Sequence, residues 1–191
     1  MLQRSSDEGL FELVEVLLKE GEADPNGTTD TADIPPALMA ANRGNGAILE
    51  LLFESGADFT LCTGDSRETV LHCLLKHGSD DRGRYERALD LVLAKEELLP
   101  QIAKIVNKRD ALKNTALHYA TQMWSQETVR KLLEAGANIG MKNHFDEVPI
   151  SKILPDTMED FLDEFCLDAT RDVHHEDFEI TFNYSFLAPP R

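Results

Sequence analysis

The stretch that decides the fold runs from Asn114 to Asn138 and reads NTALHYATQMWSQETVRKLLEAGAN. It begins with Thr115, whose hydroxyl can cap a backbone N–H near His118. Leu117 and Ala120 follow, about one helical turn apart, and are predicted to point inward. The stretch therefore opens with a short capped helix that has one apolar side.

A second helix follows after a break at the tryptophan. Ser125 can cap it, and Val129, Leu132 and Leu133 lie at the i, i+3 and i+4 positions of one apolar stripe. Gly136 supplies the left-handed residue that ends the helix. The sequence thus predicts one unit made of helix, turn, helix and glycine stop.

Related units recur along the chain at a fixed period. Pro36 lies 33 residues before Thr69, and Val148 lies 33 residues after Thr115. The interval from Thr69 to Thr115 is 46 residues, which indicates an insertion of 13. The pattern T-x-L-H-x-A followed by V-x-x-L-L-x-x-G-A-N resembles the ankyrin repeat, with Ala116 in the proline position. The resemblance implies an all-α ankyrin-repeat solenoid of about four to five repeats, with a short C-terminal β-strand and linker.

The first repeat is predicted to be truncated. Asp7 can cap a helix whose apolar stripe is formed by Leu10, Leu13, Val14, Leu17 and Leu18. This helix corresponds to the second helix of a repeat, and the first is missing or only hinted at before residue 7. Because terminal repeats normally carry a polar cap, we expect further repeats before Met1 in a longer protein.

The second and third units follow with different regularity. In the second, Ala37, Leu38 and Ala41 are predicted for the inner helix and Ile48, Leu51 and Leu52 for the outer one, with Gly56 as the stop. The third has a polar turn over 77–84 and an outer helix from Tyr85 to about Lys95, carrying Leu89 and Val92. The extra segment Glu96–Lys108, around Pro100, is expected to project from the stack. It either carries contacts or reflects neutral drift, which we favour.

The C-terminal part is predicted in three pieces: repeats over 1–154, a closing helix over 155–167, and an acidic linker with an aromatic strand over 168–191. Pro149 marks a final degenerate repeat, and Asp156 with Glu159 forms a capping-box pattern. The closing helix presents one apolar face, formed by Met158, Phe161, Leu162 and Phe165. Between Asp156 and Glu179 stand ten acidic residues and one arginine, which is at least a solvated face and otherwise a docking surface for a basic partner.

The last segment alternates with a period of two, which predicts a half-buried β-strand. Its apolar face consists of Phe178, Ile180, Phe182, Tyr184 and Phe186. A lone strand is not stable, so it either lies back on the last repeat or pairs with a segment that this chain lacks.

The charge, hydropathy and cysteine content of the chain limit the classes of function that it can have. The formal net charge of −16 argues against nucleic acid and anionic lipid as partners, because both require basic surfaces. Neither a leader nor an apolar run long enough to span a bilayer is present in the sequence. The three cysteines, Cys62, Cys73 and Cys166, form no close pair, which favours free thiols in a reducing compartment. Cys62 lies on a loop and is the thiol most open to modification, but no basic residue flanks it, which favours an unreactive side chain. Cys73 is predicted to be core.

The candidate chemical sites have structural explanations. Thr69 with His72 and Thr115 with His118 are hydroxyl–imidazole pairs, but neither has an acidic third member and both recur at matched repeat positions. They are assigned, with Gly56 and Gly136, as structural repeat positions. The run from His174 to Asp177 cannot converge on one ion by itself, and no nucleotide, zinc-protease or hydrolase motif occurs. We therefore expect no enzyme, no cofactor and no metal site.

A longer match extends from Val129 to Cys166, VRKLLEAGANIGMKNHFDEVPISKILPDTMEDFLDEFC, and then through DFEITFNYSFL and APP. It resembles the end of the ankyrin domain in the TRPA family of transient receptor potential cation channels, with insect Painless- and Pyrexia-like members as the nearest likeness. In that family a helix like Met158–Cys166 is followed by a short aromatic strand. The close resemblance covers about sixty residues, and the rest matches only as ankyrin repeats.

The TRPA resemblance implies a sensory cation channel subunit, gated by thermal or noxious stimuli, at the cytoplasmic face of the plasma membrane. Its partners would be the other subunits of a homotetramer, and its pore and membrane contact would lie in a region after this chain. The segment 178–186 would be a coupling strand. The alternative is a soluble cytoplasmic adaptor that binds a protein partner through its concave face and its repeat fingers. A third interpretation, an ankyrin-linked enzyme, has no residue in its favour.

Overall fold

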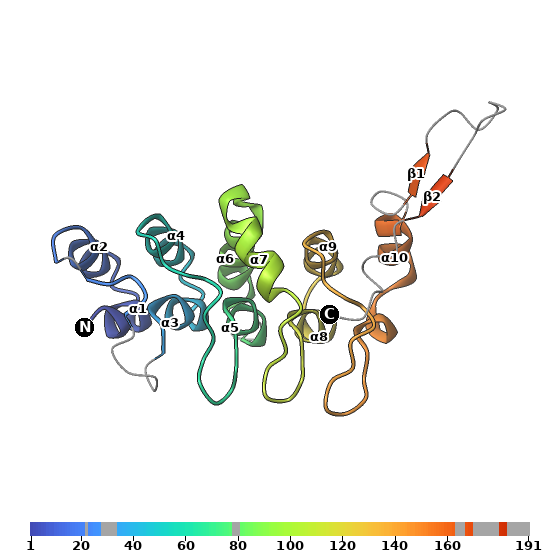
Figure 1. The fold of residues 1–191 in the computed structure, drawn as a ribbon, viewed down its shortest axis with the longest axis horizontal. Coiled ribbons are helices and arrows are strands. Elements are labelled where there is room, and N and C mark those ends of the chain that lie inside the picture. Colours follow the sequence, from blue (N-terminus) through green and yellow to red (C-terminus); the bar gives the residue numbers. More distant parts are fainter. Residues whose placement is uncertain (22, 28–33, 78–80, 163–166, 170–179, 183–191) are drawn as a thin grey trace.

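The computed structural model describes residues 1–21, 23–27, 34–77, 81–162, 167–169 and 180–182. Helices stack side by side in two rows (Figure 1). The inner row consists of α1 (Leu2–Glu8), α3 (Pro36–Asn42), α5 (Val70–Lys76) and α8 (Ala116–Met123). The outer row consists of α2 (Phe11–Lys19), α4 (Gly46–Glu54), α6 (Arg82–Ala94) and α9 (Gln126–Glu134). Long hairpin loops extend beyond the inner row, and the all-α repeat architecture agrees with the prediction.

The core is continuous along the stack and is built from short apolar inner helices. On α3 the side chains of Ala37, Leu38 and Ala41 are buried, and on α5 Leu71 and Leu74 are fully buried. Each inner helix packs against the next, α1 on α3, α3 on α5 and α5 on α8. Small residues on α3 let its neighbours approach closely, so each layer is stabilised by the layers beside it.

The first unit differs from the prediction, because it has both of its helices. Residues Leu2–Glu8 form α1, in which Ser5 and Ser6 are buried against the next unit. Asp7 does not cap α2; its carboxylate accepts two hydrogen bonds from the Arg43 guanidinium, at 2.9 and 3.1 Å. The inner helix escaped detection because its buried face carries serines, not the apolar residues by which an amphipathic pattern is recognised.

The insertion also differs from the prediction, because it does not project from the stack. It forms a 3-10 turn, η1 (Glu96–Leu98), and helix α7 (Leu99–Ile105). The buried side chains are Leu98, Ile102, Ile105 and Val106, each no more than 1% exposed. Their spacing is that of one amphipathic helical stripe, so the insertion is part of the core.

Polar contacts fix the insertion to the preceding loop. The Gln101 side-chain oxygen accepts a hydrogen bond from the backbone N–H of Phe59 at 2.8 Å. The Lys108 ammonium donates to the carbonyl oxygen of Thr60 at 2.9 Å. Phe59 is itself 1% exposed, so the inserted residues are bonded to a loop that is part of the core.

The last helical elements are η2 (Pro149–Lys152) and α10 (Pro155–Phe161), which packs against α9. Phe161 is buried, as expected for a closing layer, whereas Phe165 lies outside the described residues. The expected capping box is wrong. Leu154 precedes the helix without a side-chain cap, because Pro155 occupies its first turn and shifts Asp156 inside it.

The partner of the C-terminal strand is within the chain. Strand β2 (Ile180–Phe182) pairs antiparallel with β1 (Leu167–Ala169), with Asp168 opposite Thr181. The two predictions for this strand, packing on the last repeat or pairing with a segment that the chain lacks, are therefore wrong for β2. The flanking aromatic positions Phe178, Tyr184 and Phe186 lie outside the described residues. In the described part of the chain, no helix combines the length and apolar character needed to cross a bilayer.

Replacing Ile102 by alanine tests whether the insertion is part of the core. Ile102 is 1% exposed, so Ile102→Ala should lower the free energy of unfolding by about 2 to 5 kcal/mol. Leu99→Ala on the same helix removes a side chain that is 44% exposed and should cost much less. Urea unfolding of both variants measures the difference. Equal and small effects would mean that α7 is not integral to the fold.

Candidate binding surface

Three hairpin loops of equivalent geometry, here called fingers, connect successive units at 63–68, 109–114 and 142–147 (Figure 1). Each has one non-glycine residue in the left-handed region at the matching position: Arg67 at φ 54°, Lys113 at φ 59° and Asp146 at φ 59°. Side chains rarely adopt this conformation unless surrounding bonds hold it. The recurrence shows that the fingers have one shared, well-defined turn.

Side-chain oxygens at the finger bases supply those bonds. The Asp110 carboxylate accepts from the backbone N–H of Leu112 and Asn114, at 2.9 and 2.8 Å. It also accepts from the Tyr119 hydroxyl at 2.6 Å, and burial, together with this contact, raises the pKa of Tyr119 to about 12. In the third finger Asn143 takes the place of Asp110. Each finger is therefore held from within.

Neighbouring fingers are also bonded to each other. The backbone N–H of Ala111 donates to the carbonyl of Ser66, and that of His144 donates to the carbonyl of Leu112, both at 2.9 Å. At the base, the Asn143 side-chain amide donates to the Asn114 side chain at 3.0 Å. The three fingers thus form one row with a fixed spacing, suited to presenting a continuous surface.

The pair Thr69 and His72 joins one unit to the next. The His72 Nδ1 accepts a hydrogen bond from the Thr69 backbone N–H at 3.2 Å, while Nε2 lies 3.0 Å from the carbonyl oxygen of Asn114. A carbonyl can only accept, so the proton is assigned to Nε2. The neutral ring therefore bridges the start of α5 and the finger that precedes α8.

The pair Thr115 and His118 repeats this arrangement one unit later. Nδ1 of His118 accepts from the Thr115 backbone N–H at 3.0 Å, and Nε2 lies 3.2 Å from the carbonyl oxygen of Glu147. Burial lowers the pKa of both histidines below the ordinary value of 6.5. Protonation would place a second N–H against a backbone N–H donor, so both rings suit a neutral bridging role.

The other sequence-selected residues lie apart from the fingertips. Gly56 and Gly136 follow α4 and α9 at φ 88° and 91°, the left-handed conformation in which glycine has no steric penalty. Cys62 is exposed at the base of the first finger. Cys73 is fully buried, and burial raises the pKa of its thiol to about 12, which disfavours the reactive thiolate.

The fingertips carry a surface that the sequence analysis missed. Leu112 is 50% exposed and Phe145 is 68% exposed, and the bond between their two fingers brings them to neighbouring tips. Arg67, Arg109 and Lys113 are exposed around them, without an ion pair among the described residues. We call these five residues the fingertip patch. A large apolar residue at the tip of a polar hairpin was the signal that could have revealed it.

A polar hollow lies beside the fingertip patch, between the first finger and α3. Its volume is about 540 Å³. The residues that line it are Ile34, Asn42, Thr63, Gly64, Asp65, Ser66 and Glu68. Five of these seven residues carry a hydroxyl, amide or carboxylate group, so the hollow offers hydrogen-bonding groups next to the fingertips.

Metal binding has no support in the described ranges, where no group of three or more histidine, cysteine, aspartate or glutamate side chains could hold an ion. The run from His174 to Asp177 lies outside these ranges.

A comparison with known protein families adds to this geometry. The model described as "Ankyrin repeats (3 copies)" matches residues 37–143, more than half of the chain. This chain belongs to the ankyrin repeat family. The match spans the second to fourth units with the insertion between them, and its description names a repeat architecture and no catalytic activity. Among curated proteins, none matches this chain.

The two buried histidines predict a pH dependence of stability. Since their folded pKa lies below 6.5, the unfolded chain takes up protons first as the pH falls. Stability is therefore complete above about pH 7.5 and falls as the pH drops below about 6.5, so it should be lower at about pH 5.5 than at about pH 7.5. Urea unfolding at both pH values measures this loss.

The double variant His72→Gln/His118→Gln provides the contrast. It should be less stable at every pH, with a smaller difference between about pH 7.5 and about pH 5.5. His144→Gln replaces an exposed histidine and should keep the pH dependence of the wild type. An undiminished pH dependence in the double variant would show that other groups cause it.

Proposed function

We propose that this chain is a protein-interaction module that binds a partner polypeptide through the fingertip patch, and that it is not an enzyme. The observation that carries the proposal is the exposure of Leu112 and Phe145 on adjacent, hydrogen-bonded fingertips. Exposed apolar side chains on a rigid surface commonly mark protein contacts, and aromatic residues supply much of their binding energy.

The charged side chains on the fingers indicate which kind of partner segment the fingertip patch favours. The chain as a whole carries a formal net charge of −16, yet the second finger carries Arg109 and Lys113, both exposed, beside Leu112. Its single carboxylate, Asp110, is 6% exposed and engaged with its own loop. The first and third fingers carry the exposed carboxylates of Asp65 and Asp146, so the basic charge belongs to the second finger. It favours a partner segment that places an acidic side chain beside the apolar contact with Leu112.

Replacing Phe145 by aspartate should remove this interaction. The change takes an apolar anchor from the patch and adds a repulsive charge, so affinity for the partner should fall at least about tenfold. Partners captured with the wild-type chain can be identified and their binding to purified variants measured by titration calorimetry. Phe145 is 68% exposed, so the variant should keep the unfolding midpoint of the wild type.

Leu154→Asp is the matched control, because Leu154 is 54% exposed but lies at the start of α10, away from the finger row. Partners of the fingertip patch should bind this variant as they bind the wild type. If Phe145→Asp retained every partner, or if both variants lost the same ones, the fingertip patch would not be the binding surface.

A finer hypothesis is that this module belongs to a TRPA-type cation channel subunit. The resemblance of the segment from Val129 to Cys166, and of the aromatic segment after it, supports this hypothesis. Under it the chain would lie at the cytoplasmic face of the plasma membrane, the other subunits of a tetramer would be partners, and 178–186 would couple the repeats to the pore. The soluble adaptor is the simpler alternative and needs only the repeat surface.

The full transcript on either side of this chain separates the two. A channel requires several apolar membrane-spanning segments encoded after Arg191, and further repeats before Met1 would fit the same protein. A stop codon directly after Arg191 would exclude the channel for this product and leave the adaptor. The fingertip experiment does not depend on this outcome.

A further inference from the structure

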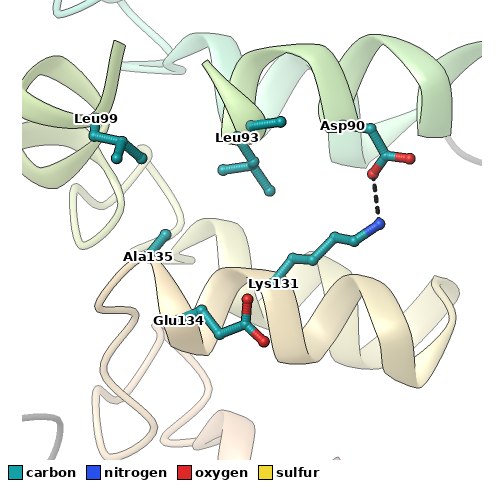
Figure 2. Close-up of a pocket in the computed structure, with 7 residues that line it drawn as sticks. Asp90, Leu93, Leu99, Lys131, Glu134 and Ala135 are labelled. Carbon is teal, nitrogen blue, oxygen red and sulfur yellow. Dashed lines mark hydrogen bonds and ion pairs between the residues drawn. The ribbon is translucent and has the colours of Figure 1, made fainter. Parts of the chain in front are cut away.

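A second recessed surface lies in the outer row of helices, away from the fingertips. It is an open groove of about 400 Å³ between α6, α7 and α9. The lining residues are Asp90, Leu93, Ala94, Leu99, Lys131, Glu134 and Ala135. Figure 2 shows Leu93 and Leu99 on one side, Ala135 opposite them, and the Lys131 side chain reaching across to Asp90.

The insertion contributes to this groove, because Leu99 of α7 lines it. The outer helices α4 and α6 pack closely, whereas α6 and α9 touch much less extensively. Between Ala94 and Asn107, η1 and α7 place Leu98 and Ile102 into the core. The groove therefore lies where α6 packs least extensively against the next outer helix, and a residue of the insertion forms part of its lining.

The floor of the groove is apolar and partly uncovered. Leu99 is 44% exposed although its neighbour Leu98 is fully buried, and Leu93 and Ala135 are partly exposed. These side chains come from three different elements and face one volume. The volume falls within the range of ordinary ligand sites, about 300 to 1,000 Å³, and accommodates two or three aliphatic side chains.

The charges around the groove are unequal. Lys131 is neutralised by Asp90, with Nζ 2.9 Å from Oδ1, and this ion pair closes one end. Glu134 lies on the wall of the groove and forms an ion pair with Arg130, whose Nε is 2.9 Å from the Glu134 Oε1. Glu96 and Glu97 are exposed, and in the sequence they lie between two residues that line the groove, Ala94 and Leu99. The surroundings therefore favour a basic occupant.

The geometry points to this groove as a docking site for an amphipathic helix of a partner protein, with two aliphatic side chains on the apolar floor and a lysine or arginine beside Glu134. A helix suits the site because the groove lies between two helices of a stacked row, where a third can place side chains from one face. A second copy of this chain is disfavoured by its own negative charge. The docking site does not depend on the function proposed for the fingertips.

A random-peptide library displayed on phage, selected on the intact chain, tests this inference. Peptides that use the groove should bind the wild type and lose at least about tenfold in affinity on Leu99→Glu, which places a charge on the floor. Their sequences should share aliphatic residues at i and i+4 with a nearby lysine or arginine. Glu134→Lys should weaken the same peptides through charge repulsion.

The matched control is Leu112→Glu in the fingertip patch, where the original side chain is 50% exposed, against 44% for Leu99. Groove peptides should bind this control as tightly as the wild type, and all variants should share the unfolding midpoint of the wild type. Methyl signals of Leu93, Leu99, Ala94 and Ala135 should shift when a synthetic groove peptide is added, and the bound peptide should be helical.

Three results would overturn the inference. One is a selection in which no peptide discriminates the wild type from Leu99→Glu. Another is a set of discriminating peptides that are acidic, or that bind in an extended conformation. The third is binding lost on Leu112→Glu and retained on Leu99→Glu, which would assign the peptides to the fingertips and support the proposed function in place of the groove.

Discussion

Each helix pair of this chain has apolar side chains on two flanks, and a flank is removed from water only where another layer lies against it. In the middle of the stack the condition is met on both sides, and Leu71 and Leu74 of α5 are fully buried between α3 and α8. Among the described residues only one flank of α2 is covered, and Phe11 and Val16 of this helix remain 40% and 48% exposed. Stability in such a stack depends on contacts between neighbouring layers, so each interface matters to the whole.

The same interfaces orient the recognition surface. The bridge from His72 to the Asn114 carbonyl, and the amide contact between Asn114 and Asn143, join the inner helices to the finger bases. The stacking of the inner helices therefore determines the position of each fingertip. The insertion contributes to the other row, where Ile102 of α7 is buried and Leu99 of the same helix lies at the surface beside α6 and α9. Stacking thus produces two surfaces that differ in charge and in the kind of partner they favour.

The sequence by itself determined the repeat period and the residues at which the helices of a repeat begin and end. The interval between Thr115 and Val148 predicted the period, the hydroxyl of Ser125 predicted the start of α9, and Gly136 predicted its end. These features are readable because each depends on bonds or backbone angles within a few residues. The stripe of Val129, Leu132 and Leu133 was equally readable, since the helical period alone brings these side chains onto one face.

Only the tertiary structure decided where the less regular segments lie. The serines of α1 are buried because α3 covers them, and a small polar side chain gives no hydrophobic pattern from which burial could be predicted. The insertion has a helical stripe, but a stripe does not say what it packs against, and only the structure shows Leu98 and Ile102 buried in the core of the stack. Strand β2 could not be assigned a partner from its alternation, because alternation defines a face and not the segment that pairs with it. The fingertip patch and the groove arise in the same way, from side chains of separate units that only the stacking of the layers brings together.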